Sequence, residues 1–388
     1  MLNRIPLQEL KKPRLLSVVP NTNTANQLYR SWPTNLDSTR PYATQPPPLL
    51  DTSKFCKKMQ KFLTIMEINP STLKLSDPYT KNNIEMIKNI LQQPPCHIPS
   101  NEISIATHPG PHKTDNEDCI SVIHPPDIPE IKAIICTDGV SIGLPRTPFE
   151  RNENGIAASN YINNQLGIWI KSDAFKTIFY ELINQDKSKY DRISKFFEDV
   201  TNAVQKIAKN IYPKNSSTTL ELTFLVQYEN QNYVFAFSWG DSSTFIYKNK
   251  ITVPLNVYYY NNVTQLNTGY NIFFEKNFLN ASIKSSDPED PGAVINAHDA
   301  YRQKPSLTIM PINDGDTVII ATDGYIDNLS KTCPNDPSKI LFQTDLAGKL
   351  ITLCDELNIK DRASLIASVC GVIREKPDDI TVAVVPPQ

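Results

Sequence analysis

Acidic residues at the ends of short apolar runs are the feature of this 388-residue sequence that points most directly to chemistry. The segment "IKAIICTDGVSIG" (131–143) runs through apolar residues into Asp138, and "VIIATDGYIDNLS" (318–330) does the same into Asp323. One such ending is explained by an ordinary strand-to-turn junction, because Asp and Gly are turn formers. Two of them, far apart in the sequence, indicate two strand ends that are brought together around a shared site.

More carboxylates hold comparable positions in the sequence. Glu117 and Asp118 stand just before one apolar run, and Asp378 and Asp379 open the last one, "DDITVAVV". Hard divalent cations such as Mg²⁺ and Mn²⁺ take carboxylate, carbonyl and water oxygens as ligands. Two such ions about 4 Å apart can activate a bridging water and hold a phosphoryl group. The set of acids fits such a site, although each acid taken alone is better explained by a solvated surface position.

The composition narrows the class of protein. With 40% hydrophobic and 21% charged residues the chain is expected to be globular. Its net charge of −2 gives no overall field that favours nucleic acid or an anionic membrane surface. The seven cysteines are odd in number and lack a C-x-x-C pair, which argues against a disulfide framework or a structural zinc site and favours a reducing compartment. No apolar stretch approaches the roughly 18–20 residues of a membrane-spanning helix, so we expect no integral membrane segment.

The chain divides into three regions. Residues 1–50 are rich in Pro, Asn and Thr and are expected to form a flexible tail. Their first thirty residues are basic with Glu9 as the single acid, a pattern compatible with a mitochondrial transit peptide, although the prolines interrupt a long helix. A mitochondrial matrix location is therefore our expectation, with cytoplasm or nucleus as the alternative. Residues 51–100 contain two helical patterns and are expected to form a helical extension of a domain that spans 101–388.

The pattern changes at about residue 101 to short β-branched runs with short polar connections between several of them. Such neighbours predict antiparallel hairpins rather than strict β-α-β alternation. The runs are "EISIAT", "AIIC", "TLELTFLVQY", "NYVFAF", "STFIY", "TVIIATD" and "ITVAVV". Helical patterns are interleaved at about 155–171, 190–210, 338–357 and 361–374. The prediction is an α+β domain with layered sheets and covering helices.

An ordered set of segments over roughly 101–386 resembles the landmarks of the metal-dependent serine/threonine protein phosphatases of the type 2C (PPM) family, closest to the eukaryotic branch with mitochondrial matrix members. The segments are "NED" (116–118), "TDGVSIG" (137–143), "NGIAASNYI" (154–162), "SSTTL" (216–220), "SWGDSSTFIY" (238–247), "GDTVIIATDGYIDNL" (315–329) and "DDITVAVV" (378–385). The resemblance implies a four-layer α-β-β-α sandwich in which two antiparallel sheets are flanked by helices. It also implies hydrolysis of phosphoserine and phosphothreonine in phosphoprotein substrates, by a water activated between two Mg²⁺ or Mn²⁺ ions.

The resemblance also implies roles for individual residues. Asp138 would be the carboxylate that bridges both metals, and the Gly139 carbonyl would be a ligand directly or through water. Asp323 and Asp378 would hold one metal, and Glu117 would hold the other.

Two further residues complete the set that the resemblance implies. Asp118 would orient waters or ligands of the metal centre. The family usually has an arginine that binds the substrate phosphate four residues before Glu117, and here that position is Lys113. Lysine keeps the charge but loses the bidentate hydrogen-bonding geometry of guanidinium.

Other interpretations fit these residues less well. Asp241 in "GDS" is explained by a tight turn between two strands and is left out of the metal set. The segment "DGDTV" (314–318) matches the letters of an aspartyl-phosphate phosphatase motif, but the apolar run follows the motif instead of preceding it. No cysteine has an arginine at the spacing that a cysteine-dependent phosphatase needs. The remaining alternative is a type 2C fold that is catalytically weak or inactive and serves as a scaffold or regulatory subunit.

Overall fold

The computed structural model describes the chain from residue 57 to residue 386 with gaps. The described residues are 57–66, 68–69, 73, 76–93, 102–111, 115–141, 148–184, 186–212, 216–255, 281–283, 295–296, 305–333, 336–373 and 378–386. The expected tail (1–50) and Lys113 lie outside them. None of the helices within these ranges has the length and apolar character needed to cross a membrane.

Two antiparallel sheets form the centre of the fold. The first has the spatial order β1 (Ser104–His108), β15 (Ile380–Val385), β12 (Thr317–Ala321), β7 (Ser243–Lys248) and β8 (Ile251–Pro254). The second has the order β10 (Ile295–Asn296), β4 (Ser216–Thr218), β3 (Ile131–Ser141), β5 (Leu220–Tyr228), β6 (Gln231–Trp239), β11 (Ser306–Ile312) and β9 (Ala281–Ile283), and β2 (Asp118–Ile123) also pairs with β3. All the strand runs expected from the sequence are therefore found.

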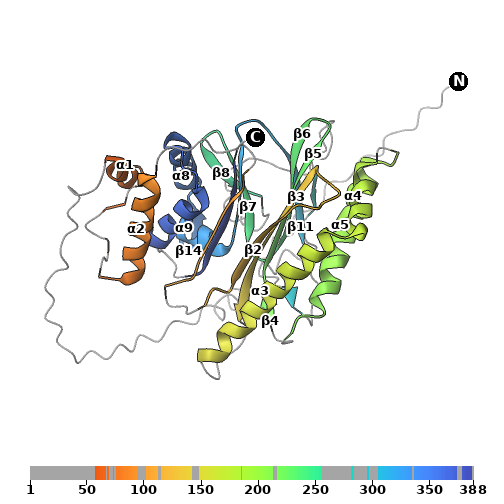
Figure 1. Ribbon diagram of the computed structural model, residues 1–388, viewed down its shortest axis with the longest axis horizontal. Coiled ribbons are helices and arrows are strands. Elements are labelled where there is room, and N and C mark those ends of the chain that lie inside the picture. The colour runs from red at the N-terminus through yellow and green to blue at the C-terminus, as the bar shows by residue number, and fades with distance from the viewer. Residues whose placement is uncertain are drawn as a thin grey trace, which may run out of the picture. The chain divides into compact units, whose positions relative to one another are not determined.

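The sheets pack face to face and each carries helices on its outer face (Figure 1). Between the sheets lies a small apolar core that includes Ile134, Val234, Ile320 and Ala383. The outer face of the second sheet is covered by α3 (Pro148–Ile170), α4 (Asp173–Ile183) and α5 (Lys189–Ala208). The outer face of the first sheet is covered by α1 (Lys57–Ile65), α2 (Pro78–Gln92), α7 (Asp323–Asn328), α8 (Thr344–Glu356) and α9 (Arg362–Ile373). The result is the α-β-β-α sandwich that the resemblance implies, and it has the layered sheets and covering helices that the sequence pattern predicts.

Residue alternation explains how one strand serves two cores. In β5, Leu220, Leu222 and Phe224 face the helices of the second sheet, whereas Leu225 packs between the sheets. Successive side chains of a strand point to opposite faces, and the face of β5 toward the first sheet carries the buried polar residues Glu221 and Thr223 before Leu225. This is why "TLELTFLVQY" alternates between apolar and polar residues up to Phe224 and is continuously apolar only from Phe224 to Val226.

One helical boundary and one whole helix differ from the sequence expectation. The pattern expected over 338–357 is wrong in its first part, because β14 (Asp336–Phe342) pairs with β13 (Ser330–Cys333) and α8 begins only at Thr344. A short apolar run such as 340–342 cannot be assigned to strand or helix by periodicity alone. The sequence also did not predict α4, which follows α3 after two residues and is capped by Ser172.

The two helices expected between 51 and 100 are found as α1 and α2. Asp77 caps the start of α2, where its side chain accepts a hydrogen bond from the backbone N–H of Thr80. Buried residues of both helices, including Met59, Phe62 and Ile87, belong to the same apolar cluster as α8 and α9. The extension thus contributes to the helical layer on the first sheet.

A buried carboxyl group, Glu221, interrupts the apolar contact between the sheets. It lies on β5 and is fully buried, and its Oε1 accepts a 2.6 Å hydrogen bond from the Thr244 hydroxyl on β7 of the other sheet. The same hydroxyl lies 2.6 Å from that of Thr223. Burial raises the pKa of Glu221 from about 4.5 to about 8, which keeps the group neutral near pH 7.

The raised pKa of Glu221 predicts how the stability of the protein changes with pH. Because the folded-state pKa lies above the unfolded value, the folded protein holds the Glu221 proton more tightly, and stability falls as pH rises from about 4.5 to about 8. The slope from this one group is at most about 1.4 kcal/mol per pH unit. Glu221→Gln keeps an acceptor for Thr244 but cannot ionise, so urea unfolding should find it more stable than wild type at pH 8, with a smaller difference at pH 5.

The matched control is Glu198→Gln, which changes an exposed carboxylate on α5. It should follow the wild-type pH dependence. A Glu221→Gln difference of the same size at both pH values would show that the ionisation of Glu221 does not limit stability.

Candidate active site

The acids predicted from the sequence meet at one edge of the sandwich. In the β2–β3 pair, Asp118 lies directly opposite Asp138. In the other sheet, β12 and β15 run antiparallel, so the end of β12 lies beside the start of β15. Asp323 comes shortly after the end of β12 and Asp378 shortly before the start of β15, so these two acids lie at the same edge. The two sheets therefore bring four acids from distant parts of the sequence to one place.

The electrostatics of Asp138 reflect this convergence. Burial raises the pKa of its carboxyl group well above the usual range, and nearby negative charges raise it further. These charges belong, in decreasing order of effect, to Asp118, Asp323, Asp241 and Asp378. The group is ionised easily only where a positive charge compensates for these neighbours.

Asp118 is held on the opposite strand by a hydrogen bond from the other sheet. Its Oδ2 accepts a 2.9 Å bond from the Thr322 hydroxyl, and Thr322 in turn accepts the N–H of Thr381 at 3.1 Å. Burial raises the pKa of Asp118, and the charge of Asp379 raises it further. Asp138 lies within hydrogen-bonding reach of Asp118, whose Oδ1 receives no hydrogen bond from a donor in the described part of the chain. Two carboxyl groups in such contact share a proton or a cation between them.

Glu117 is placed beside this pair by a close approach of backbone to backbone. Its carbonyl accepts hydrogen bonds from the N–H of Gly139 at 3.1 Å and from the Ser159 hydroxyl at 2.6 Å. A Cβ at Gly139 would lie 2.4 Å from the carbonyl carbon of Gly155 on α3, and a Cβ at Gly155 would lie 2.7 Å from Oε1 of Glu117. Only glycine fits at position 139, because a Cβ there would overlap the backbone of Gly155, and a Cβ at position 155 would displace the Glu117 carboxylate.

The backbone of Asp138 is fixed on its other side by a group of hydroxyl residues. Its carbonyl accepts the N–H of Thr219 and the hydroxyl of Thr218, both at 2.8 Å. Its own N–H donates to the Thr219 hydroxyl at 3.2 Å, and this hydroxyl lies 2.7 Å from that of Ser242. The segment "SSTTL" thus acts as a support for the aspartate, a role that its letters alone did not indicate.

Three residues of this site were missed or given a smaller role by the sequence analysis. Asp241 was interpreted as a turn residue, and the structure adds that its charge acts on Asp138. An acid at the end of an apolar run, here "FAFSWGD", is the same signal that identified Asp323 and could have identified Asp241. Thr322 carries no comparable signal and Asp379 is indicated only as the neighbour of Asp378, because their roles depend on which groups the fold places against them.

The donor set fits hard divalent cations by its chemistry. Carboxylate oxygens are the preferred ligands of Mg²⁺ and Mn²⁺, and the Asp118 oxygen without a hydrogen-bond donor is the kind of atom that an ion satisfies. Over the described ranges, however, no three His, Cys, Asp or Glu side chains lie close enough to form a metal-binding group as they stand. The cluster therefore has the composition and the charge of a metal site, although its side chains do not converge on a common point within those ranges.

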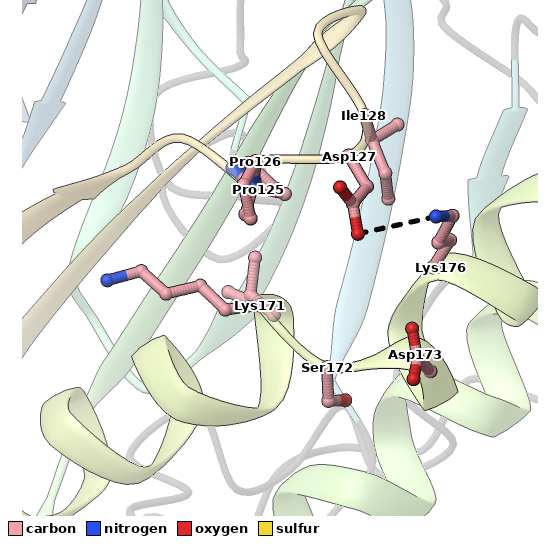
Figure 2. A pocket seen from close by; sticks show the side chains of 9 residues that line it. Pro125, Pro126, Asp127, Ile128, Lys171, Ser172, Asp173 and Lys176 are labelled. Atoms are coloured by element: carbon pink, nitrogen blue, oxygen red, sulfur yellow. Dashed lines mark ion pairs between the residues drawn. The ribbon is translucent and has the colours of Figure 1, made fainter.

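A small surface hollow lies near the start of β3, at the end of this strand away from Asp138 (Figure 2). It is lined by Pro125, Pro126, Asp127, Ile128, Ile170, Lys171, Ser172, Asp173 and Lys176, and Lys176 pairs with Asp127 at 3.3 Å. Both partners of this ion pair are substantially exposed, so it contributes little. The start of β3 beside this hollow is about 23 Å from Asp138 along the strand, so the hollow is not part of the acidic site.

Comparisons with known proteins find similarity only among solved structures. No family model and no curated protein matches the sequence. The serine/threonine phosphatase of S. agalactiae is 18% identical over 73% of this chain and 98% of its own, with a TM-score of 0.46. The catalytic domain of the phosphatase PstP, solved with two manganese ions, is 15% identical over 73% and 96%, with a TM-score of 0.42. The PPM Ser-Thr phosphatase MsPP from Mycobacterium smegmatis is 14% identical over 74% and 98%, also with 0.42. Because these sequence identities and TM-scores are low, the function of this chain must be argued from its own residues.

The hydroxyl of Thr322 provides a test of the site's architecture. Thr322→Val keeps the shape but removes the hydrogen bond to Asp118 and the acceptor of the Thr381 N–H. Each buried group left without a partner costs about 1–3 kcal/mol, so urea denaturation should show a clear loss of stability. The matched control is Thr317→Val at the start of β12, the strand that Thr322 follows, where the fully buried hydroxyl has no hydrogen-bond partner among the described residues. The control should be neutral or stabilising, and equal losses in the two variants would contradict the cross-sheet bond.

Proposed function

We propose that this protein is a metal-dependent protein phosphatase that hydrolyses phosphoserine and phosphothreonine. The observation that carries the proposal is the buried contact between Asp118 and Asp138, with the charges of Asp323 and Asp378 close enough to raise the pKa of Asp138. Such mutual repulsion is unfavourable unless protons or cations neutralise it, and hard dications are the metal ions that carboxylates prefer. The resemblance of the sequence to the type 2C family supports the same chemistry.

The proposed ligands come from both sheets. Asp138 would contact both ions, Asp323 and Asp378 would hold one, and Glu117 together with the Gly139 carbonyl would hold the other. A pair of Mg²⁺ or Mn²⁺ ions, when bound, supplies an activated water and neutralises the charge of the phosphoryl group.

The chain's own groups have defined tasks in this proposal. Asp118, fixed by Thr322, would orient the waters or ligands around Glu117. Lys113, which lies outside the described residues, would offer a positive charge to the substrate phosphate.

A second candidate function is a type 2C fold that acts as a scaffold or regulatory subunit. Its specific support is that the described carboxylates do not converge in groups of three, and that lysine stands where the family usually has arginine. Against it, the full set of implied ligands is present in the sequence. We favour the enzyme for this reason.

The location of the protein is a separate proposal. The basic, acid-poor start of the sequence supports import into the mitochondrial matrix, with residues 1–50 as a transit peptide or flexible tail and 51–100 as an extension of the catalytic domain. Cytoplasm or nucleus is the alternative.

The metal assignment predicts the effect of single charge removals. Asp138→Asn and Asp323→Asn each delete a ligand charge, so Mn²⁺-dependent turnover of a phosphothreonine peptide should fall at least about 100-fold while the protein stays folded. EDTA should abolish wild-type turnover. Glu130→Gln, which changes an exposed acid outside the site, should leave turnover unchanged. Wild-type rates in either aspartate variant would end the two-metal assignment, and no turnover by wild type with either metal would favour the scaffold.

The phosphate contact predicts a graded effect at Lys113. Lys113→Ala should lower kcat/KM by roughly one to two orders of magnitude, about 1.4–2.7 kcal/mol of transition-state stabilisation, with metal affinity nearly unchanged. Lys113→Arg should retain activity, because guanidinium offers the same charge with two parallel hydrogen bonds. Unaltered kinetics in the alanine variant would show that another group receives the phosphate.

A further inference from the structure

The geometry points to Asp379 as the residue that positions Glu117 for metal binding. Asp379 is 2% exposed, and its two carboxylate oxygens accept hydrogen bonds from two different backbone N–H groups. Oδ1 accepts the N–H of Gly110 at 2.6 Å, and Oδ2 accepts the N–H of Glu117 at 2.8 Å. One side chain therefore fixes both ends of the connection from β1 to β2. This inference rests on the proposed function, because it assigns a role within that site.

The chemistry of the carboxylate is essential to this arrangement. An ionised aspartate has two acceptor oxygens and no donor, so it can receive both N–H groups at once. An asparagine of the same shape offers one acceptor and one NH₂ donor, which would face a backbone N–H across a buried contact. The donor–donor contact would force one end of the connection away.

The position of Asp379 links the two sheets at the acidic edge. It precedes β15 in the first sheet, next to Asp378, whereas Glu117 precedes β2 in the second sheet. Gly110 packs closely enough on this segment that a Cβ there would lie 3.0 Å from the carbonyl carbon of Asp378. Asp379 of the first sheet thus places Glu117, the proposed ligand from the second sheet. Its neighbour in the sequence, Asp378, is the proposed ligand from the first sheet.

Asp379 also contributes negative charge near the site. Its charge is among the causes that raise the pKa of Asp118, second after burial. A neutral substitution could therefore weaken cation binding by removing charge alone. The test must separate loss of charge from loss of position.

Two variants make this separation. Asp379→Asn removes the charge and one acceptor, whereas Asp379→Glu keeps the charge and both oxygens but displaces them by one methylene. If Asp379 positions Glu117, both variants should bind Mn²⁺ about 10–100-fold more weakly than wild type, the usual effect of losing a group that orients a metal ligand. Amide hydrogen exchange at Gly110 and Glu117, measured without metal, should be at least about tenfold faster in both. Wild-type Mn²⁺ affinity in Asp379→Glu would overturn the positioning role and leave a charge effect only.

The matched control is Asp316→Asn. Asp316 is also buried, and its Oδ2 also accepts a backbone N–H, that of Asn313 at 2.9 Å in the turn before β12. This variant should lose stability without changing Mn²⁺ affinity or exchange at Gly110 and Glu117. An equal effect of the Asp316 and Asp379 variants on Mn²⁺ affinity would reduce Asp379 to a general structural residue.

The outcome can be distinguished from failure of the proposed function. Wild-type protein that binds Mn²⁺ but does not hydrolyse a phosphothreonine peptide would count against the phosphatase only. Unchanged exchange at Gly110 and Glu117 in Asp379→Asn would overturn the positioning role whatever the activity. If Asp379→Asn does not fold, the glutamate variant and its exchange rates decide the question.

Discussion

Mutual repulsion among buried carboxylates at one edge of the sandwich is the constraint on which the rest of this structure depends. Two like charges 4 Å apart at an effective dielectric constant of 20 repel each other by about 4 kcal/mol. Asp138 faces the charges of four other aspartates, and its pKa is raised by burial and then by each of them. A protein keeps such a group together only when the surrounding fold holds it and a cation or proton compensates for it.

The fold resists this repulsion with apolar contacts and hydrogen bonds, both within and between the sheets. An apolar core lies behind the acids, and hydroxyl and backbone groups hold the strand ends themselves. Thr322 donates to Asp118 from the other sheet, and Thr219 and its neighbours hold the backbone of Asp138. Asp379 joins the β1–β2 connection to the start of β15. These contacts fix the backbone of the site, and in the described part of the chain Oδ1 of Asp118 receives no hydrogen bond, so an ion can satisfy it.

Much of the fold could be predicted because the pattern of apolar residues along each strand shows which of its residues are buried. Period-two alternation in "TLELTFLVQY" and the apolar runs ending in Thr-Asp-Gly identify β5, β3 and β12 and place Asp138 and Asp323 at strand ends. The boundary at β14 could not be predicted, because three apolar residues fit a strand and a helix equally well. The roles of Thr322 and Asp379 could not be predicted either, because their hydrogen-bond partners lie far away in the sequence. These partners are a carboxyl group for Thr322 and two backbone N–H groups for Asp379.

The most direct test of this account is the thermal stability of the folded protein across a titration with Mn²⁺. If the acids form a cation site, binding should raise the free energy of unfolding by RT ln(1 + [Mn²⁺]/Kd), about 2.7 kcal/mol at a hundredfold excess over Kd. The unfolding temperature should therefore rise with Mn²⁺ in a saturable way, and the rise should be lost in Asp138→Asn. The same unfolding temperature in Mn²⁺ and in EDTA, or an equal rise in the variant, would contradict the claim that these carboxylates are gathered to hold a dication.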